Sequence, residues 1–434
     1  MTTRILVGHV LDQLASLADE SVHCVVTSPP YYGLRDYGIE PQVWGGDPGC
    51  AHEWGRNLPA RSQSGGVAGF QTSNAGSFHA GQASTFCCRC NDWRGSLGLE
   101  PTLALYLDHM VEVFREVRRV MRKDATCWLN IGDSYAAQGG FGSGGNAARM
   151  GRANQQRNDR PNRPRDGLKP KDLMLIPSRL AIRLQEDGWW VRSDVIWAKK
   201  APMPESCTDR PTSAHEHVFL LTKSARCYYD AEAVKEDAEG NTHPTRKDGL
   251  VMPPRGGIDS GGARHSMPSI PLTHRNLRNV WHLGPEPFPE AHFATYPTEI
   301  PRRAILAGTS ERGVCPKCAA PWARVVETES WTERPNSGGV RGGIPSQCVQ
   351  LGAMQRGNRF AEATTIGWRP TCGCDAGDSI SAKVLDPFLG SGTTALVADR
   401  LGRDCIGIEL NPDYAAMARH RVEADARLFA EVTD

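Results

Sequence analysis

Residues 383–410, KVLDPFLGSGTTALVADRLGRDCIGIEL, form the most regular stretch of the sequence and decide the fold. One apolar run ends at Asp386, a glycine-rich turn follows, a helical apolar pattern covers TALVADRLG, and a second apolar run ends at Glu409. A strand, a tight turn, a helix and another strand in this order are typical of a parallel α/β unit. We therefore expect an α/β fold with a mostly parallel sheet.

The turn in this stretch has the spacing G-x-G-x-x-A from Gly390 to Ala395. Its glycines allow a ligand to approach the backbone, and the helix start offers free N–H groups to an anionic group. Glu409 follows at the end of the next strand, where a carboxylate can accept hydrogen bonds from both ribose hydroxyls. We predict a nucleoside-containing cofactor, because the missing lysine argues against an ATP-binding Walker loop and the two-glycine turn weakens NAD. The alternative is a plain strand–helix turn with a surface glutamate.

The candidate cofactor contacts lie in this turn and at the end of the second strand. They are Asp386, Pro387, Phe388, Gly390, Ser391, Gly392, Thr393 and Glu409.

A second motif, Thr27-Ser-Pro-Pro-Tyr31, follows the apolar run VHCVVT at 22–27. Two prolines cannot continue a β-ladder, so the chain leaves the sheet there with a carbonyl pointing outward. The Ser28 hydroxyl and the Pro29 carbonyl can then accept both hydrogens of an exocyclic amine. The ring of Tyr31 offers a face on which a flipped-out base can stack. An ordinary exit from a strand is the alternative. The candidate catalytic residues are Ser28, Pro29, Pro30 and Tyr31.

Periodicity predicts the other elements. Apolar residues from Leu103 to Met121 recur every three or four positions, which predicts a helix with Pro101 in its first turn. Further helices are expected at 173–187 and 299–307, and further strands at 126–133, 189–197 and 215–223.

Together the two motifs resemble those of the amino-methylating DNA methyltransferases. The order here, with the catalytic motif first and the cofactor motif last, is similar to that of their β group, whose target-recognition region lies between the two. Gly8-His-Val-Leu11 looks like the N-terminal cofactor-side motif of that family. Stretches that resemble later family motifs are 129–133, 196–199, 209–217 and 292–297.

The resemblance implies a Rossmann-like fold, S-adenosylmethionine as methyl donor and double-stranded DNA as substrate. It also implies direct in-line transfer to an exocyclic amine, for which alignment is the main requirement. Serine at the first motif position is associated with N4 of cytosine in these families, and aspartate with N6 of adenine. We therefore favour cytosine and keep adenine open. A C5-cytosine enzyme would need a Pro-Cys nucleophile, and the sequence has no such dipeptide.

One position departs from the family pattern. The early aspartate that usually contacts the cofactor adenine is His9 here. Asp12 or another residue is the alternative source of that contact.

Two cysteine-rich segments interrupt the α/β pattern. The chain has 14 cysteines and no export signal at its start, which favours metal sites over disulfides. One set of four ligands is Cys50, His52, Cys87 and Cys90, with Cys88 as an alternative to Cys87. The second set is Cys315, Cys318, Cys372 and Cys374. Four protein ligands leave no open position, so we expect two structural zinc sites, against the alternative of reduced thiols in loops.

Positive charge is local, since the whole chain has a net charge of only +1. Residues 149–171 are strongly basic and can neutralise phosphates without reading sequence. The segment 231–290 lies where the family keeps its target-recognition region, and arginine is the side chain that best reads guanine. Its basic residues include Arg246, Lys247, Arg255, Arg264, Arg275 and Arg278. Solvated loop charge is the alternative for each of them.

No apolar run reaches the ~18 residues of a membrane span, so we expect a cytoplasmic protein without a membrane partner. No nuclease signature is found, so a restriction enzyme would be a separate chain. A DNA-binding protein without chemistry and an RNA or protein methyltransferase are further alternatives. The expected parts are a catalytic part at 1–41 and 99–230, zinc insertions at 42–98 and 311–375, a target-recognition region at 231–290, and a cofactor part at 291–310 and 376–434.

Overall fold

The computed structural model describes most of the chain in ten separate ranges. The described residues are 1–33, 39–45, 49–54, 85–136, 167–237, 274–286, 295–328, 363–375, 377–426 and 431–433.

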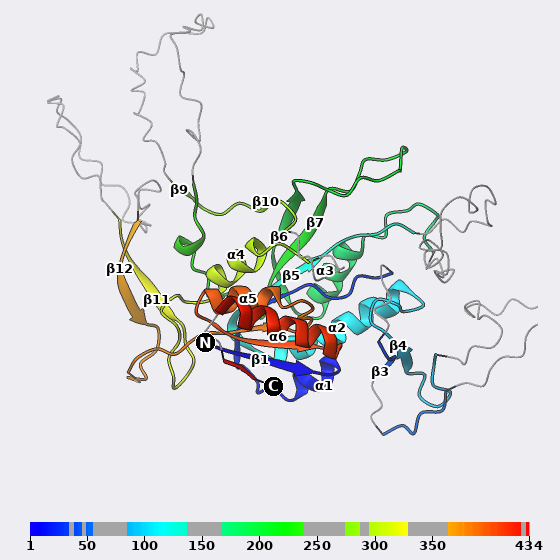
Figure 1. Ribbon diagram of the computed structural model, residues 1–434, viewed down its shortest axis with the longest axis horizontal. Coiled ribbons are helices and arrows are strands. Elements are labelled where there is room, and N and C mark those ends of the chain that lie inside the picture. Colours follow the sequence, from blue (N-terminus) through cyan, green and yellow to red (C-terminus); the bar gives the residue numbers. More distant parts are fainter. Residues whose placement is uncertain are drawn as a thin grey trace, which may run out of the picture.

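A nine-stranded sheet forms the centre of the molecule (Figure 1). Its strands are β1 (Thr2–Val7), β2 (Val22–Thr27), β5 (Met121–Ile131), β6 (Trp190–Lys199), β7 (His215–Thr222), β10 (Val280–Leu283), β13 (Lys383–Asp386), β14 (Asp404–Glu409) and β15 (Glu431–Thr433). They are ordered β10-β6-β7-β5-β2-β13-β14-β1-β15. Every neighbouring pair is parallel except those of β7, which runs antiparallel to β5 and β6. The expected mostly parallel α/β sheet is confirmed.

Helices cover both faces of the sheet. One face packs against α1 (Val10–Ala15), α2 (Leu103–Val120) and α3 (Ile176–Glu186), and the other against α4 (Glu299–Gly308), α5 (Thr393–Arg400) and α6 (Pro412–Ala426). Each side has its own apolar core, so the central strands are buried on both faces, as in other doubly covered parallel sheets. Within the described residues, no helix combines the length and apolar character needed to span a bilayer.

Short elements lie outside the central sheet. They are the hairpin β3 (Gln42–Trp44) with β4 (Trp93–Gly95), the 3₁₀ turn η2 (Glu232–Val234), the pair β8 (Glu236–Asp237) with β9 (His274–Arg275), and the hairpin β11 (Trp322–Thr328) with β12 (Ala363–Pro370). The β11–β12 hairpin projects at the left of Figure 1, and β3–β4 lies on the opposite side. The two cysteine-rich segments thus flank the sheet from opposite ends.

Two sequence expectations differ from the structure at the start of α2 and of β5. The Thr102 hydroxyl caps α2 by accepting from the Leu105 N–H at 3.2 Å, so Pro101 precedes the helix instead of occupying its first turn. A threonine oxygen can accept this bond and a proline cannot, which explains the boundary. The next strand begins at Met121 rather than 126, because Arg122, Lys123 and Asp124 hide its start from a hydrophobicity pattern.

Candidate active site

The two sequence motifs meet at the carboxyl ends of the parallel strands. Strands β2 and β13 are parallel neighbours, so both end on the same side of the sheet. The Thr27 hydroxyl at the end of β2 donates to the Asp386 carboxylate at the end of β13, at 2.7 Å. Thr27 and Asp386 are 359 positions apart in the sequence. Their hydrogen bond places Ser28, the residue after Thr27, close to the start of the glycine turn.

Asp386 supports the glycine turn from inside the protein. It is fully buried and accepts from the Thr394 hydroxyl at 2.7 Å, the Phe388 N–H at 3.0 Å and the Tyr296 hydroxyl at 3.2 Å, as well as from Thr27. Burial raises the pKa of Asp386, and these hydrogen bonds oppose the rise. The carboxylate thus fixes the backbone of the turn, with its oxygens directed to protein donors.

The glycines of the turn are required by backbone conformation. Gly390 and Gly392 have φ values of 53° and 79°, in the left-handed region that favours glycine. A Cβ on Gly392 would lie 2.8 Å from the Cβ of Ala418 in α6. Arg421 of α6 donates to the Ser391 carbonyl at 3.1 Å and the Thr393 hydroxyl at 2.9 Å. The turn is therefore held open against α6, with Gly392 at the N-cap of α5.

Glu409 lies beside the turn at the end of β14. Its two carboxylate oxygens accept from the N–H groups of Gly390 and Asn411, both at 2.8 Å. Burial raises the pKa of Glu409, and these backbone donors oppose the rise. A carboxylate oxygen can accept more than one hydrogen bond, so both oxygens can also accept hydrogen bonds from hydroxyl groups. The arrangement fits recognition of a ribose.

His9 lies on the same side of the site, directly after Gly8. The Gly8 N–H donates to the Glu409 carbonyl at 3.0 Å. The His9 ring packs edge-on against Trp44 of β3, with centroids 4.6 Å apart, and burial lowers the pKa of His9. His9, the residue that departs from the family pattern, therefore connects the first cysteine-rich segment, through Trp44, to the cofactor side of the sheet.

Ser28 begins a hydrogen-bonded network of side chains. Its hydroxyl lies 3.3 Å from the Tyr31 hydroxyl and 3.4 Å from the Asn130 side-chain nitrogen. The Tyr31 hydroxyl donates to Glu216 at 2.7 Å, and Asn130 donates to Tyr31 at 2.8 Å and to Glu216 at 3.0 Å. Lys199 holds the other Glu216 oxygen at 2.6 Å.

Three members of this network received no role in the sequence analysis. Asn130 lies on β5, Lys199 ends β6 and Glu216 is near the start of β7. Because β7 runs against its neighbours, its first residues lie at the edge where β5 and β6 end. All three lie in stretches that resemble family motifs, 129–133, 196–199 and 209–217, which was the available signal. The reversed strand that brings Glu216 there was not visible from the sequence.

Contacts from α2 and the preceding loop shape the Ser-Pro-Pro-Tyr turn. The Tyr106 hydroxyl donates to the Pro30 carbonyl at 3.0 Å. Gly98, with φ 90°, packs so closely that a Cβ would lie 2.9 Å from the Tyr31 carbonyl. Buried Glu100 accepts from the Gly98 N–H at 2.8 Å and is itself paired with His109 at 3.0 Å. Within the described residues, the Pro29 carbonyl makes no hydrogen bond, in contrast to that of Pro30.

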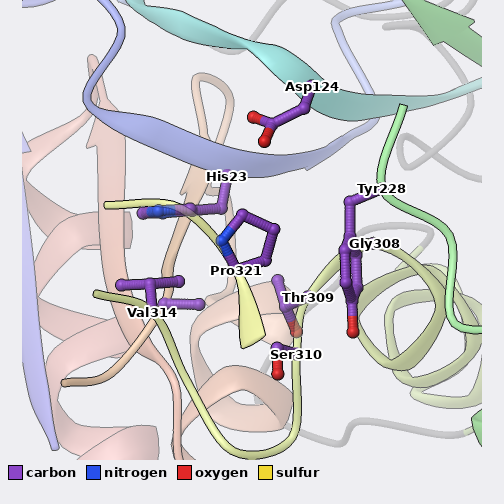
Figure 2. A pocket seen from close by; sticks show the side chains of 9 residues that line it. His23, Asp124, Tyr228, Gly308, Thr309, Ser310, Val314 and Pro321 are labelled. Carbon is purple, nitrogen blue, oxygen red and sulfur yellow. The ribbon is translucent and has the colours of Figure 1, made fainter. Parts of the chain in front are cut away.

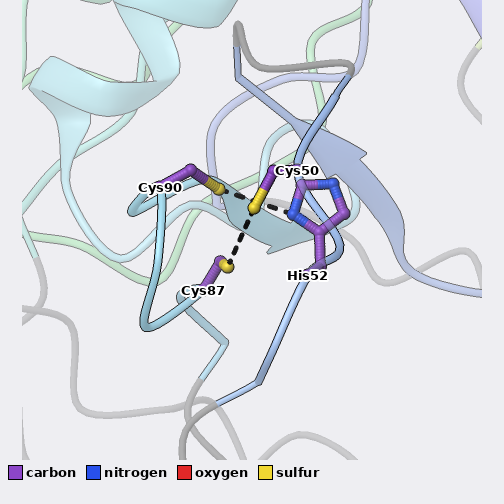
Figure 3. Close-up of side chains that lie close together, drawn as sticks. All are labelled: Cys50, His52, Cys87 and Cys90. Carbon is purple, nitrogen blue, oxygen red and sulfur yellow. Dashed lines mark hydrogen bonds between the residues drawn. The ribbon is translucent and has the colours of Figure 1, made fainter.

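The first cysteine set is assembled by the structure (Figure 3). Cys50, His52, Cys87 and Cys90 place their ligand atoms within 4.8 Å of one another. The Cys50 and Cys87 sulfurs are 3.9 Å apart, and the Cys90 sulfur lies 3.4 Å from Nδ1 of His52. Tetrahedral zinc with S ligands needs sulfur–sulfur separations of about 3.7 Å, so the group has the right size. Cys88 is exposed and outside the group.

The second set is assembled as well. Cys315, Cys318, Cys372 and Cys374 also lie within 4.8 Å of one another, at the base of the β11–β12 hairpin. The sheet contacts this group through Arg122, which donates to the Cys318 carbonyl at 2.9 Å, and through His23, whose Nε2 lies 3.0 Å from the Ala319 carbonyl.

A small cavity lies at this junction (Figure 2). Its lining residues include His23, Asp124, Tyr228, Ser310, Val314 and Pro321. His23 belongs to the first half of β2, whereas Ser28 follows the end of that strand. The cavity is therefore separate from the network around Ser28.

The described residues contain little of the predicted DNA-binding surface. Most of 149–171, and Arg246, Lys247, Arg255 and Arg264, lie outside them. Arg275 and Arg278 are described, and both donate to Glu236, at 3.1 and 3.0 Å. These two arginines are engaged within the protein.

Comparison with known proteins shows the family of the chain. The model of the DNA methylase family, which covers N6 and N4 methyltransferases, matches residues 22–315 and 379–420. Type II methyltransferase M.SmaI of Serratia marcescens is 32% identical over 419 residues, covering 96% of this chain and 90% of its own. M.Cfr9I of Citrobacter freundii is 32% identical, with 96% and 87% covered. The structure of PvuII DNA methyltransferase (cytosine-N4-specific) aligns with a TM-score of 0.46 and 14% identity over 97% of this chain and 87% of its own.

Proposed function

The chain belongs to the DNA methylase family and is an S-adenosylmethionine-dependent DNA amino-methyltransferase, and from that premise we propose that it methylates N4 of cytosine in duplex DNA. The target base would be flipped out of the helix, because its amine is otherwise inaccessible to the catalytic turn. The observation that supports methyl transfer at this site is the Thr27–Asp386 hydrogen bond, which joins the catalytic and cofactor motifs, whereas the choice of cytosine depends on Ser28.

The Ser-Pro-Pro-Tyr turn supplies acceptors for the amine. In the proposal, the Ser28 hydroxyl oxygen and the Pro29 carbonyl each accept one amine hydrogen, which turns the nitrogen lone pair out of conjugation with the ring. Pro30 keeps the turn in place through its bond from Tyr106. The partly buried ring of Tyr31 is the stacking surface for the base. Serine at the first motif position is what favours cytosine over adenine.

The glycine turn and Glu409 fit the methyl donor. In the proposal, Glu409 holds the ribose hydroxyls, and the backbone of residues 387–393 lies against the rest of the donor. Bound there, S-adenosylmethionine supplies an electrophilic methyl group on a cationic sulfur. The main task of the chain is then to align donor and amine, since the sulfur loses its charge as the methyl leaves.

Product analysis tests the base assignment. Unmodified duplex DNA is incubated with the protein and S-adenosylmethionine, and its nucleosides are measured by mass spectrometry. N4-methylcytosine is the expected product. N6-methyladenine would move the assignment to adenine, and neither product from folded protein would contradict the proposed activity.

We also propose that both cysteine sets hold structural zinc. Each has four ligands of the kinds zinc prefers, and each joins segments that have little apolar core of their own. Metal analysis of the purified chain is expected to give two zinc ions. Cys90→Ser should remove one of them, whereas Cys88→Ser, a change at the exposed neighbour, should leave both. Retention of both ions in Cys90→Ser would contradict the first site.

The remaining partners are proposals as well. Duplex DNA would be contacted by the basic segment 149–171 and by the region 231–290. A restriction enzyme with the same recognition sequence would be a separate chain.

A further inference from the structure

The ion pair between Lys199 and Glu216 is the far end of the network that starts at Ser28. Its charged atoms are 2.6 Å apart, and the two side chains are 29% and 14% exposed. The second Glu216 oxygen takes donors from both Tyr31 and Asn130. No part of the proposed alignment of amine and donor explains why a charged pair is placed behind the serine.

The direction of each hydrogen bond follows from the chemistry of the carboxylate. Ionised Glu216 can only accept, so Tyr31 must donate its hydroxyl hydrogen to it, and Asn130 must present its NH₂ group. The Tyr31 oxygen is then left as an acceptor, and the Ser28 hydroxyl can direct its hydrogen there. One acceptor position of the Ser28 oxygen faces the Asn130 NH₂ group at 3.4 Å, and the other is left to face a substrate amine.

We propose that Ser28, Tyr31 and Glu216 form a proton relay that takes the proton released by the methylated amine away from the site. The inference rests on the proposed function, because it assumes an amine held at Ser28. Glu216 acts through the two hydroxyls and is a positioning residue and final acceptor that does not touch the base. Lys199 holds the other oxygen of this carboxylate at 2.6 Å.

The step balances in atoms and charge. The amine lone pair forms the new N–C bond while the C–S bond breaks, and its electrons stay on the sulfur. The nitrogen then carries a positive charge and gives one proton to the Ser28 oxygen. Ser28 passes its own hydrogen to Tyr31, Tyr31 passes its hydrogen to Glu216, and the carboxylate becomes a neutral acid beside Lys199.

The resting state suits this direction of transfer. Burial, and then the negative charge of Glu216, hold the pKa of Tyr31 well above its usual value, so the phenol is protonated and able to donate. A methylated aminium is a far stronger acid than a carboxylic acid, so a carboxylate at the end of the path is basic enough. The Tyr31 ring edge lies against Gly132, where a Cβ would come within 2.8 Å of it, and this contact keeps the hydroxyl in line.

The test is a kinetic double-mutant cycle on the full-length, zinc-loaded enzyme with duplex DNA. Tyr31→Phe keeps the ring and removes the hydroxyl, and Glu216→Gln keeps the shape and removes the charge. Each is expected to lower kcat by about 10²-fold, with KM for DNA and S-adenosylmethionine changed less than about threefold. The double variant should be no slower than the slower single variant, because both changes break one path. Asp194→Asn, which removes a carboxylate on the neighbouring strand β6, is the matched control and should keep the wild-type kcat.

A second measurement separates the relay from a purely structural role. The free energy of unfolding of the same four proteins, without DNA or donor, reports how strongly Tyr31 and Glu216 are coupled in the folded state. Non-additive kcat values in variants whose free energy of unfolding stays close to that of the wild type support the relay. Wild-type kcat in Glu216→Gln, or effects of the two variants on kcat that simply multiply, would overturn it while leaving the proposed function intact. A wild-type enzyme that methylates neither base would overturn both.

Discussion

The cofactor side and the catalytic side of the site occupy the same edge of the sheet but are built in different ways. The main part of the cofactor side is a backbone turn of nine consecutive residues, 386–394, around the fully buried Asp386, with Glu409 of β14 beside it. The catalytic side is a network of side chains from β5, β6, β7 and the turn after β2, with its carboxylate still partly exposed. In the proposed assignment, a local turn would fix where the donor binds, whereas long-range packing would decide what surrounds the reacting amine.

Ser28→Ala is the strongest test of this division. We expect kcat to fall by roughly 10³-fold, or about 4 kcal/mol, because the hydroxyl that faces the amine is lost. Cofactor affinity, measured by calorimetry, should stay within about twofold, since the glycine turn is untouched. Ser16→Ala, at the end of α1, serves as a control for the loss of a hydroxyl. Full activity in Ser28→Ala would remove this residue from the mechanism.

Asp386→Ala tests the opposite side. Four protein donors point at this carboxylate, and removing it takes away their shared acceptor, with the Val26 carbonyl remaining for Thr394 alone. We expect the free energy of unfolding to fall by about 3 kcal/mol, measured by chemical denaturation. Asp378→Ala, at an exposed ion pair with Arg312, should change it by less than about 0.5 kcal/mol. Equal effects of the two substitutions would show that Asp386 does not support the turn.

Substitutions at the two glycines of the turn distinguish the effect of backbone strain from that of a steric clash. Both Gly390→Ala and Gly392→Ala force a side chain into the left-handed region, at a cost of about 1 kcal/mol. Only at Gly392 would the new Cβ also clash with Ala418, whereas nothing lies within 4 Å at Gly390. We expect Gly392→Ala to lower both the melting temperature and the affinity for the cofactor more than Gly390→Ala does. Expressed as free energy, its effect should be about twice as large. The reverse order would mean that ligand approach at Gly390 dominates.

The smallest expected effect comes from the far end of β2. Burial, partly opposed by the hydrogen bond to Ala319, lowers the pKa of His23 to about 4. The unfolded chain therefore binds this proton below about pH 6.5, while the folded protein does so only near pH 4, so stability is full above pH 6.5 and decreases as the pH falls. We expect a loss on the order of 1 kcal/mol from pH 7.5 to pH 5.5. His23→Gln should flatten this part of the stability–pH curve, and an unchanged slope would assign it to other groups.

The parts of the fold that could be predicted from the sequence are those built from neighbouring residues. The glycine turn, its flanking strands and the four-residue catalytic turn could each be predicted because their residues are consecutive. The two cysteine sets were also found, since their ligands occur in close pairs and the structure brings the pairs together. The roles of Lys199 and Glu216 were not predicted, because they depend on which strand lies beside β5 and on the reversed direction of β7.

The order of strands in the sheet also has a consequence for how the protein is made. Strand β1 pairs with β14 and β15, which lie about 400 residues further along the chain. At ribosomal speeds of about 5–20 residues per second, β1 waits roughly 20–80 s for its partners. During that time its buried residues, such as Ile5, have no sheet to pack against. Of the described strands of the sheet, β1 is thus the earliest to be synthesised and among the last to be paired.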